Sequence, residues 1–250
     1  MNHYILSDIH EDFYALQKVI SEISQDTQPY AIHSLGDNIG FSTHYQSQKH
    51  KRNANGCISL LKANHVASVL GNHDLHFLGR KPKLPFFIPP PGWEALSLDE
   101  KIEHGGIWLY LDELPTQLDN DNFAYLDNLD DYAMYPDLLF SHFLFPDFNG
   151  SLILKKGQPD KLLPVHFIFM QINKLKLSFV GHLHMQQPII ISSQMEKRVL
   201  KSGESIFLDT TNTSFTVFCP AINTYNSQQS KFMSYSEESG ILKYHCIDTN

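Results

Sequence analysis

The 250-residue sequence predicts an α/β fold with a mixed sheet system. Units of strand, polar loop and helix repeat near the N-terminus, and such repeats build parallel sheets that helices cover on both faces. Further apolar runs then end at polar residues, and short β segments follow residue 185. Since no low-complexity linker, internal repeat or charge block divides the chain, we expect a single domain over residues 1–250.

The first unit begins with an apolar run at residues 4–6, which we expect to be a strand. The polar segment Ser7-Asp8-Ile9-His10 follows it. Apolar residues then recur at three- and four-residue spacing, which is typical of a helix buried on one face. These residues are Phe13, Leu16, Val19, Ile20 and Ile23.

Two more units follow the same plan. Residues 30–35 read as a buried strand that ends at Gly36-Asp37-Asn38, and a helix is expected near residues 58–62. A third strand is expected at residues 66–70, and it ends at Gly71-Asn72-His73-Asp74.

The alternation breaks in an excursion at residues 79–115, which contains several prolines. We expect helices over residues 93–103 and 107–114, the second closed by Pro115 because proline is poorly tolerated inside a helix. The excursion is either a surface loop without consequence or a lid beside the site, since long loops in compact domains are often functional. Its aromatic residues could stack on a nucleobase, although packing is the favoured interpretation: Phe86, Phe87, Trp93 and Trp108.

Strands resume in the second half of the chain. The apolar run 137–141 ends at His142, and the run 177–180 ends at Gly181-His182-Leu183-His184. Short β segments are expected at 189–191, 205–208 and 214–218, followed by a hairpin over 232–247 that turns at 238–240.

The composition indicates the cellular compartment in which the protein works. No apolar run approaches the roughly 18 residues needed to cross a membrane, and the N-terminus lacks the features of a secretory signal. The three cysteines are odd in number and widely spaced, which argues against a disulfide framework and favours buried thiols: Cys57, Cys219 and Cys246. We therefore expect a cytoplasmic protein with no membrane partner.

The formal net charge of −8 disfavours general binding to a phosphate backbone, so nucleic acid is not the expected partner. A local cationic metal centre could still attract a single phosphate ester. No pattern in the sequence specifies an oligomeric state.

Polar side chains at five strand ends suit a metal centre. Asp8 and His10 lie two residues apart, as do His182 and His184, so in an extended backbone each pair projects to one side. Asp37, Asn72 and His142 follow separate strands, and ligands gather at the carboxyl ends of parallel strands.

These seven residues supply two carboxylates, one carboxamide and four imidazoles, which suffice for two ions that share a carboxylate. Paired ions stabilise both the attacking and the leaving oxygen of a displacement at phosphorus. Imidazole with carboxylate favours Mn, Fe, Zn or Ni over Mg or Ca.

The ordered blocks closely resemble the calcineurin-like metallophosphoesterase superfamily. They are Asp8-x-His10, Gly36-Asp37, Gly71-Asn72-His73-Asp74, His142 and Gly181-His182-x-His184. The resemblance covers residues 1–184 directly, and the β-rich tail is similar to the second sheet of that family's αββα sandwich, in which two mixed sheets are flanked by helices. It implies that Asp8, His10 and His184 hold a first metal ion, that Asn72, His142 and His182 hold a second, and that Asp37 bridges them. Mn or Fe is the favoured pair of ions.

The same resemblance implies a mechanism in which a metal-bridging hydroxide attacks phosphorus in line. His73 would be catalytic, either stabilising the transition state or protonating the leaving group. Asp74 is the expected orienting partner of His73, because a carboxylate helps to keep an imidazole protonated and correctly turned.

Within the superfamily the chain is most similar to small bacterial phosphoesterases, which include asymmetric dinucleoside polyphosphate hydrolases. The segment Asn38-Ile39-Gly40 lacks the arginine found there in the main protein serine/threonine phosphatases. We expect a phosphoesterase that hydrolyses small phosphate esters or nucleotide-type substrates, dinucleoside polyphosphates included. The alternatives are a protein phosphatase or nuclease on the same metal centre, and a catalytically silent metal-binding scaffold.

Overall fold

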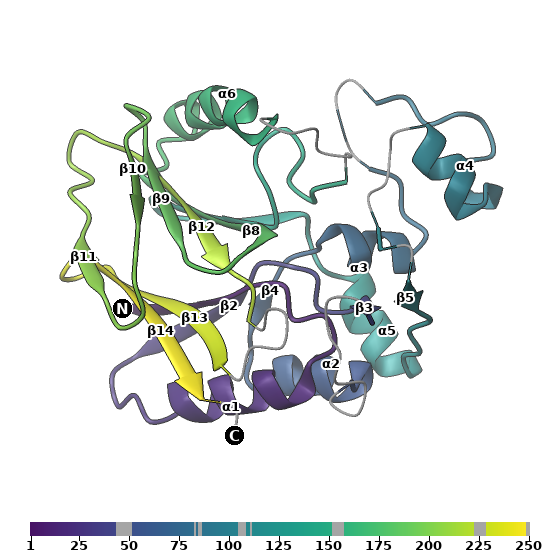
Figure 1. Cartoon of the computed structure of the whole chain (residues 1–250), viewed down its shortest axis with the longest axis horizontal. Helices are drawn as coiled ribbons and strands as arrows, with labels where there is room; N and C mark the ends of the chain where they lie inside the picture. The colour runs from purple at the N-terminus through teal and green to yellow at the C-terminus, as the bar shows by residue number, and fades with distance from the viewer. Residues whose placement is uncertain are drawn as a thin grey trace.

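The computed structural model describes residues 1–43, 52–82, 84, 87–104, 109–110, 112–151, 158–222 and 229–248. Over these residues two six-stranded sheets lie against each other at the centre of the molecule, with helices on their outer faces (Figure 1). The predicted αββα sandwich is thereby confirmed.

The first sheet has the strand order β11-β14-β13-β1-β2-β4. Its strands, in that order, span Ser205–Phe207, Ile241–Asp248, Gln229–Ser236, Asn2–Leu6, Tyr30–Ser34 and Ala67–Ser68. β1, β2 and β4 are parallel, while β13 joins β1 in the antiparallel sense. The C-terminal hairpin therefore completes a sheet that the N-terminal units begin.

The second sheet has the order β10-β9-β12-β8-β7-β6. Its strands span Lys197–Val199, Ile189–Ser192, Phe215–Pro220, Leu177–Met185, Leu138–Ser141 and Tyr132–Tyr135. β7, β8 and β12 are parallel, and the outer strands pair antiparallel. Each sheet thus has a parallel group of three strands, whose carboxyl ends can present loops to a shared site.

Three apolar layers hold the sandwich together, and strand alternation assigns residues to them. Ile5 packs between the two sheets, whereas its neighbour Leu6 packs under α1 (Phe13–Ile23) and α2 (Ala54–Ala63). In β7, Phe140 faces the layer between the sheets, and Leu139 faces α6 (Gln158–Ile172). Successive side chains of a strand point to opposite faces, so each sheet is buried on both sides.

Helix α1 confirms the predicted periodicity. Its buried residues include Leu16, Val19, Ile20 and Ile23, and Asp12 caps its first turn by accepting from the N–H of Ala15 at 3.0 Å. A capping side chain satisfies a backbone donor that the helix leaves open.

The excursion differs from the prediction. The expected helix over residues 93–103 is two short helices, η2 (Trp93–Ala95) and α4 (Leu98–Glu103), because Ser97 and Glu100 cap each other and start a new helix. The expected helix over 107–114 is wrong for its described end: Glu113–Leu114 is strand β5, which pairs antiparallel with β3 (Phe41–Ser42). Trp93 is fully buried and does not present a stacking surface, while Phe86 and Trp108 lie outside the described residues.

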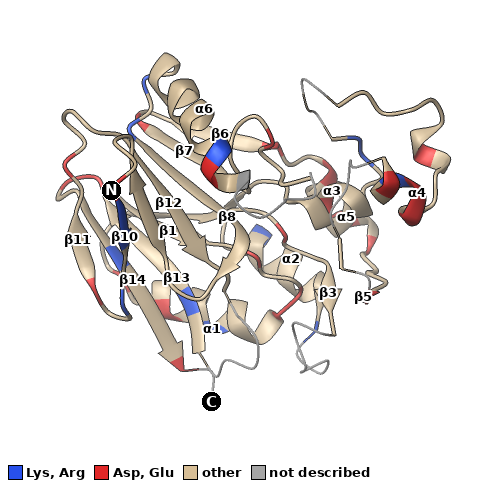
Figure 2. Ribbon diagram, turned by 45° about the horizontal axis from the view of Figure 1, so that its top comes forward, with Lys and Arg blue, Asp and Glu red and all other residues tan. Residues whose placement is uncertain are grey.

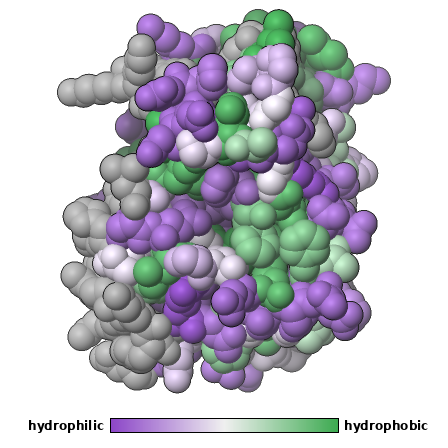
Figure 3. All heavy atoms as spheres, turned by 90° about the vertical axis from the view of Figure 1, so that its right-hand side faces the viewer, coloured by the Kyte–Doolittle hydropathy of each residue, from purple (hydrophilic) through white to green (hydrophobic). Residues whose placement is uncertain are grey.

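Helices α3 (Asn72–Phe77) and α5 (Asn120–Asp127) lie on the side of the molecule that Figure 3 faces, where hydrophobic side chains gather among hydrophilic ones. Phe77 and Phe123 pack there with ring centroids 6.0 Å apart. Leu70, just before α3, donates its N–H to the carbonyl of Asp130 at 2.9 Å. These contacts hold both ends of α3, the start through Leu70 and the end through Phe77.

In the described parts of the chain, no helix combines the length and apolar character that a membrane crossing requires.

Candidate metal centre

The seven predicted ligands come together where strands of both sheets end. Asp8 follows β1, Asp37 follows β2, and Asn72 opens α3 after β4. His142 follows β7, and His182 and His184 lie in β8. The sheets meet closely here, since the N–H of His182 donates to the Asp8 carboxylate at 3.1 Å.

The backbone at this meeting point is left-handed where an extended conformation was expected. Asp8, His10, Asp37, His182 and His184 all have φ between 44° and 67°. The prediction that each Asp-x-His or His-x-His pair projects from an extended strand is therefore wrong in its geometry, although the side chains do converge. A left-handed backbone at a non-glycine residue costs free energy, and such residues cluster at functional sites. Five of them gathered here strengthen the case for a site.

A first group consists of four side chains whose ligand atoms all lie within 4.8 Å of one another: Asp8, His10, Asp37 and His184. His10 Nε2 is 2.9 Å from His184 Nε2, and His184 Nε2 is 3.3 Å from Asp8 Oδ1. These are the residues expected around the first ion, together with the expected bridge.

A second group consists of Asp37, His142 and His182, within the same 4.8 Å limit. Asn72 belongs with them, because its Oδ1 lies 3.1 Å from His142 Nε2 and 3.0 Å from His182 Nδ1. Two imidazoles, a carboxylate and a carboxamide oxygen thus converge on one point.

Asp37 is common to both groups and has the environment of a bridging ligand. Its Oδ1 accepts from the N–H of His73 at 2.9 Å. Its Oδ2 is buried and accepts no hydrogen bond from the described residues, yet His142 Nε2 lies 3.1 Å away and His10 Nε2 lies 3.7 Å away. Buried carboxylate oxygens are normally satisfied, and a cation between these atoms would satisfy this one.

Backbone carbonyls fix which imidazole nitrogen faces the centre. His10 Nδ1 donates to Gly40 O at 2.6 Å, and His142 Nδ1 donates to Leu35 O at 2.8 Å. Since a carbonyl oxygen can only accept, Nδ1 carries a hydrogen in both rings and Nε2 is the nitrogen that faces the centre, with a lone pair whenever the ring is neutral. Ligating histidines are commonly held in this way.

Most titratable groups here favour the form that binds metal. Burial, reinforced by neighbouring imidazoles, lowers the pKa of His10 and of His182 to about 3, so both rings are neutral. Burial raises the pKa of Asp37, but His142 and His73 outweigh that effect and hold the pKa well below its usual range. His142 differs, because Asp37 and Asp8 overcome burial and raise its pKa to about 9. Metal binding at His142 therefore displaces a proton.

Residue 71 must be glycine because a side chain there would clash with its neighbours, and not because of its backbone conformation. Its φ of −95° suits any residue, but a Cβ there would lie 2.1 Å from Asp37 Oδ1 and 2.4 Å from the Asp37 nitrogen. The loops after β2 and β4 can approach this closely only because residue 71 has no side chain.

Asp74 does not orient His73 as expected. Its fully buried carboxylate accepts from the N–H groups of Gly71, Asn38 and Ile39 at 3.0–3.2 Å, and from Asn38 Nδ2 at 2.9 Å. Burial and the nearby Asp37 raise the pKa of Asp74 to about 7, against the effect of these donors. Asp74 sits at the third position of α3 and reaches back to the helix start, a common capping arrangement, so it fastens two loops together.

His73 instead pairs with Glu113, a residue that the sequence did not single out. His73 Nδ1 is hydrogen-bonded to Glu113 Oε2, and His73 Nε2 lies 3.9 Å from Asp37 Oδ2. Burial opposes the charge of His73, but Asp37 and Glu113 raise its pKa above the ordinary value. Glu113 lies in residues 110–115, a segment that also resembles the small bacterial phosphoesterases, but nothing in that segment marked Glu113 as the partner of His73.

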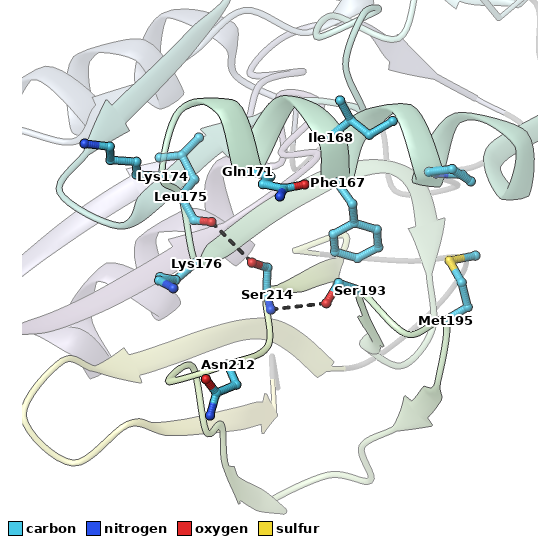
Figure 4. A pocket seen from close by; sticks show the side chains of 11 residues that line it. Phe167, Ile168, Gln171, Lys174, Leu175, Lys176, Ser193, Met195, Asn212 and Ser214 are labelled. Atoms are coloured by element: carbon cyan, nitrogen blue, oxygen red, sulfur yellow. Dashed lines mark hydrogen bonds between the residues drawn. The ribbon is translucent and has the colours of Figure 1, made fainter.

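A pocket of about 680 Å³ lies elsewhere, between α6 and the loops around β9 and β12 (Figure 4). It is lined by apolar residues such as Phe167 and Ile168 and by Lys174 and Lys176, with no carboxylate or imidazole among its lining residues. It does not overlap the two ligand groups.

Comparisons with known proteins identify the family and the fold. The sequence model of calcineurin-like phosphoesterases matches residues 1–186. An uncharacterized protein of Methanocaldococcus jannaschii is 28% identical over 177 residues, which are 62% of this chain and 68% of that protein. The crystal structure of a metallophosphoesterase from Sphaerobacter thermophilus has a TM-score of 0.67 at 18% identity and covers 99% of this chain and 89% of that one. Residues 1–186, which the family model matches, include all seven converging residues and His73.

Proposed function

The chain belongs to the calcineurin-like phosphoesterase family, and we propose that this phosphoric ester hydrolase cleaves small phosphate esters or nucleotide-type substrates at a centre of two metal ions. The observation that supports this most directly is the pair of ligand groups that share Asp37. One carboxylate common to two clusters is the arrangement that a dinuclear centre needs.

We assign Asp8, His10 and His184 to one ion, Asn72, His142 and His182 to the other, and Asp37 to both. Their imidazole and carboxylate donors suit Mn, Fe, Zn or Ni, with Mn or Fe favoured. Bound there, two such ions supply positive charge to the phosphate and activate water for in-line displacement. The chain itself would hold the ions among side chains that are largely buried.

His73 is the residue that we place beside the reacting phosphate. Its ring is buried, and its Nε2 faces the shared ligand Asp37. An imidazole in that place can donate a proton or a hydrogen bond to the leaving oxygen.

A small substrate fits the charge distribution better than a nucleic acid. In Figure 2 the Lys and Arg residues of the described chain are spread over separate elements and form no continuous strip along the strand ends. A nuclease would need such a strip to neutralise successive phosphates.

A protein phosphatase is also disfavoured, because residues 38–40 contain no arginine to clamp a phosphate and Asn38 there is already engaged within the fold. It accepts from Ser34 Oγ at 2.7 Å and donates to Asp74 Oδ2 at 2.9 Å and to Val69 O at 3.3 Å. Its side chain therefore supports the loops and does not clamp a phosphate.

We further propose that residues 1–250 act as one domain in the cytoplasm, with the excursion at 79–115 forming a rim of the site. Strand β5 of the excursion is paired with β3 beside Gly40, which supports the rim. The three cysteines are free thiols, which fits a reducing compartment.

The central test is the conservative substitution Asp37→Asn, assayed with Mn²⁺ and p-nitrophenyl phosphate. Removing the shared charge should lower both Mn content and turnover, the latter by more than about 100-fold, since even partners of metal ligands matter at the 10–100-fold level. Asp209→Asn replaces an exposed carboxylate that belongs to neither ligand group and should behave as wild type. Undiminished Mn-dependent turnover of Asp37→Asn would overturn the proposed centre, and wild-type protein that binds Mn without turnover would favour the silent scaffold.

The substrate class is then decided by a panel with the Mn-loaded protein. It should include aryl phosphates, phosphopeptides, dinucleoside polyphosphates and cyclic nucleotides. We expect turnover of the small esters and of a nucleotide-type substrate, and preference for phosphopeptides would support the protein phosphatase instead.

A further inference from the structure

The return strand of the excursion brings a carboxylate to the side of His73 that faces away from the ligand groups. Glu113 Oε2 is hydrogen-bonded to Nδ1 of the fully buried His73, and the Glu113 side chain is 18% exposed. Since an ionised carboxylate can only accept, Nδ1 carries the hydrogen in this pair. The contact with Glu113 therefore fixes Nδ1 as a nitrogen that carries hydrogen.

The opposite edge of the same ring faces the centre. His73 Nε2 lies 3.9 Å from Asp37 Oδ2, and the ring of His10 stands edge-on to His73 at 5.0 Å. The two nitrogens of His73 thus have different neighbours: Nδ1 is bonded to Glu113, and Nε2 faces the shared ligand Asp37.

The ring has little freedom to turn. Tyr110, also from the excursion, lies against it with centroids 4.8 Å apart. On another side Gly40 is so near that a Cβ there would lie 2.6 Å from His73 Cβ. A ring confined in this way keeps the direction that its hydrogen bond sets.

Glu113 is itself held by the neighbouring backbone. β5 pairs Glu113 with Ser42 and Leu114 with Phe41, and the adjacent Asp112 accepts from Ser42 Oγ at 2.8 Å and from Thr43 Oγ1 at 2.7 Å.

Arg52 adds a second hold on the same strand. Its Nη2 donates to the carbonyls of Leu114 and Pro115, and its Nε pairs with the buried Glu11. A carboxylate on so firmly attached a strand is preorganised for its partner.

We propose that Glu113 is the positioning residue of His73, so that the excursion supplies part of the catalytic machinery. Glu113 keeps hydrogen on Nδ1 and turns Nε2 toward the phosphate. As the bond between phosphorus and the leaving oxygen breaks, the proton on Nε2 passes to that oxygen, and the ring keeps its Nδ1 hydrogen. This inference rests on the proposed function, in which His73 acts at the leaving group.

The test compares Glu113→Gln with wild type on p-nitrophenyl phosphate, which has a good leaving group, and on phenyl phosphate, which has a poor one. A poor leaving group depends more on protonation, so kcat should fall by about 10-fold or less on the first and by about 100-fold on the second, within the range of general acid catalysis. KM and Mn content should stay at the wild-type values, because Glu113 belongs to neither ligand group.

Asp112→Asn is the matched control for a general disturbance of this segment, since it neutralises the carboxylate just before β5, which is hydrogen-bonded to Ser42 and Thr43. A purely structural role for Glu113 predicts that both variants lower the two rates equally. The double variant with His73→Ala gives a second readout: adding Glu113→Gln to His73→Ala should cost nothing further if the two residues act as one unit.

Three results would overturn the assignment. They are equal losses on both phosphates, additive losses in the double variant, and a leaving-group effect of the same size in Asp112→Asn. Failure of the proposed function looks different: Asp37→Asn would then retain turnover, or wild type would hydrolyse neither phosphate, and the role of Glu113 would fall with it. An inactive Asp37→Asn beside a fully active Glu113→Gln rejects the positioning role alone.

Discussion

Each residue of Gly71-Asn72-His73-Asp74 contacts a different part of the centre. Gly71 backs onto Asp37, and Asn72 Oδ1 lies between His142 and His182. His73 joins Glu113, and Asp74 joins the backbone of Asn38 and Ile39. Substitutions at neighbouring positions should therefore have separable effects.

Asn72→Ala and His73→Ala should differ in kind. Asn72→Ala removes a ligand of the second ion, so the total metal content should fall to about half of the wild-type value. His73→Ala should keep both ions and lower kcat by about 10²–10⁴-fold. Elemental analysis beside steady-state kinetics measures both quantities, with the exposed His104→Ala as control. Metal loss in His73→Ala would contradict this division.

Asp74→Ala should act on stability before it acts on rate. The substitution leaves the buried N–H groups of Gly71, Asn38 and Ile39 without an acceptor, and each unsatisfied donor costs about 1–3 kcal/mol. We expect a loss of at least about 2 kcal/mol in the free energy of unfolding by urea titration, with Asp74→Asn milder because its one oxygen can still accept. A variant that unfolds at the wild-type urea concentration but turns over slowly would restore Asp74 as the partner of His73.

At the scale of elements, the excursion shows why an apolar pattern before a proline was misread. Residues 107–114 offered helix-like spacing up to Pro115, but the described end pairs with β3 as a strand. Contacts with Ser42, Thr43 and Arg52 override the local preference. Tertiary pairing of this kind is invisible to periodicity alone.

Helix α6 is joined to the second sheet through a buried histidine, which should make the fold sensitive to acid. His166 Nδ1 accepts from the N–H of Phe145 at 2.9 Å, and its Nε2 donates to Ser178 Oγ at 3.0 Å. Burial lowers the pKa of His166 from 6.5 to about 3. Between these values the unfolded chain binds a proton that the native state does not, so stability falls as the pH falls.

His166→Gln should flatten that dependence, because glutamine keeps a donor and an acceptor but does not titrate in this range. Wild type should lose about 1.4 kcal/mol more per pH unit than His166→Gln between about pH 6 and about pH 4. Urea unfolding at both pH values measures the difference, and His104→Gln controls for an exposed histidine. Parallel pH profiles for wild type and His166→Gln would show that His166 does not contribute.

At the scale of the whole molecule, the centre exists because two sheets end at the same place. Asp8, Asp37 and Asn72 come from the first sheet and its loops, and His142, His182 and His184 come from the second. The apolar layer between the sheets, with Ile5, Phe140, Phe179 and Met233, holds the two halves in register. Neither sheet alone supplies a complete ligand group, since Asp8 meets His184 and Asp37 meets His142.

The sequence by itself determined the donor types, their order along the chain and their places at strand ends, because chemistry and apolar periodicity are local properties. It also predicted α1 and the sandwich through its resemblance to a family. Only the tertiary structure decided the left-handed backbone at Asp8 and His10, the space that requires Gly71, and the partners of Asp74 and His73. Glu113 lies 40 residues from His73, and which carboxylate reaches a buried imidazole depends on the path of a loop that no local pattern specifies.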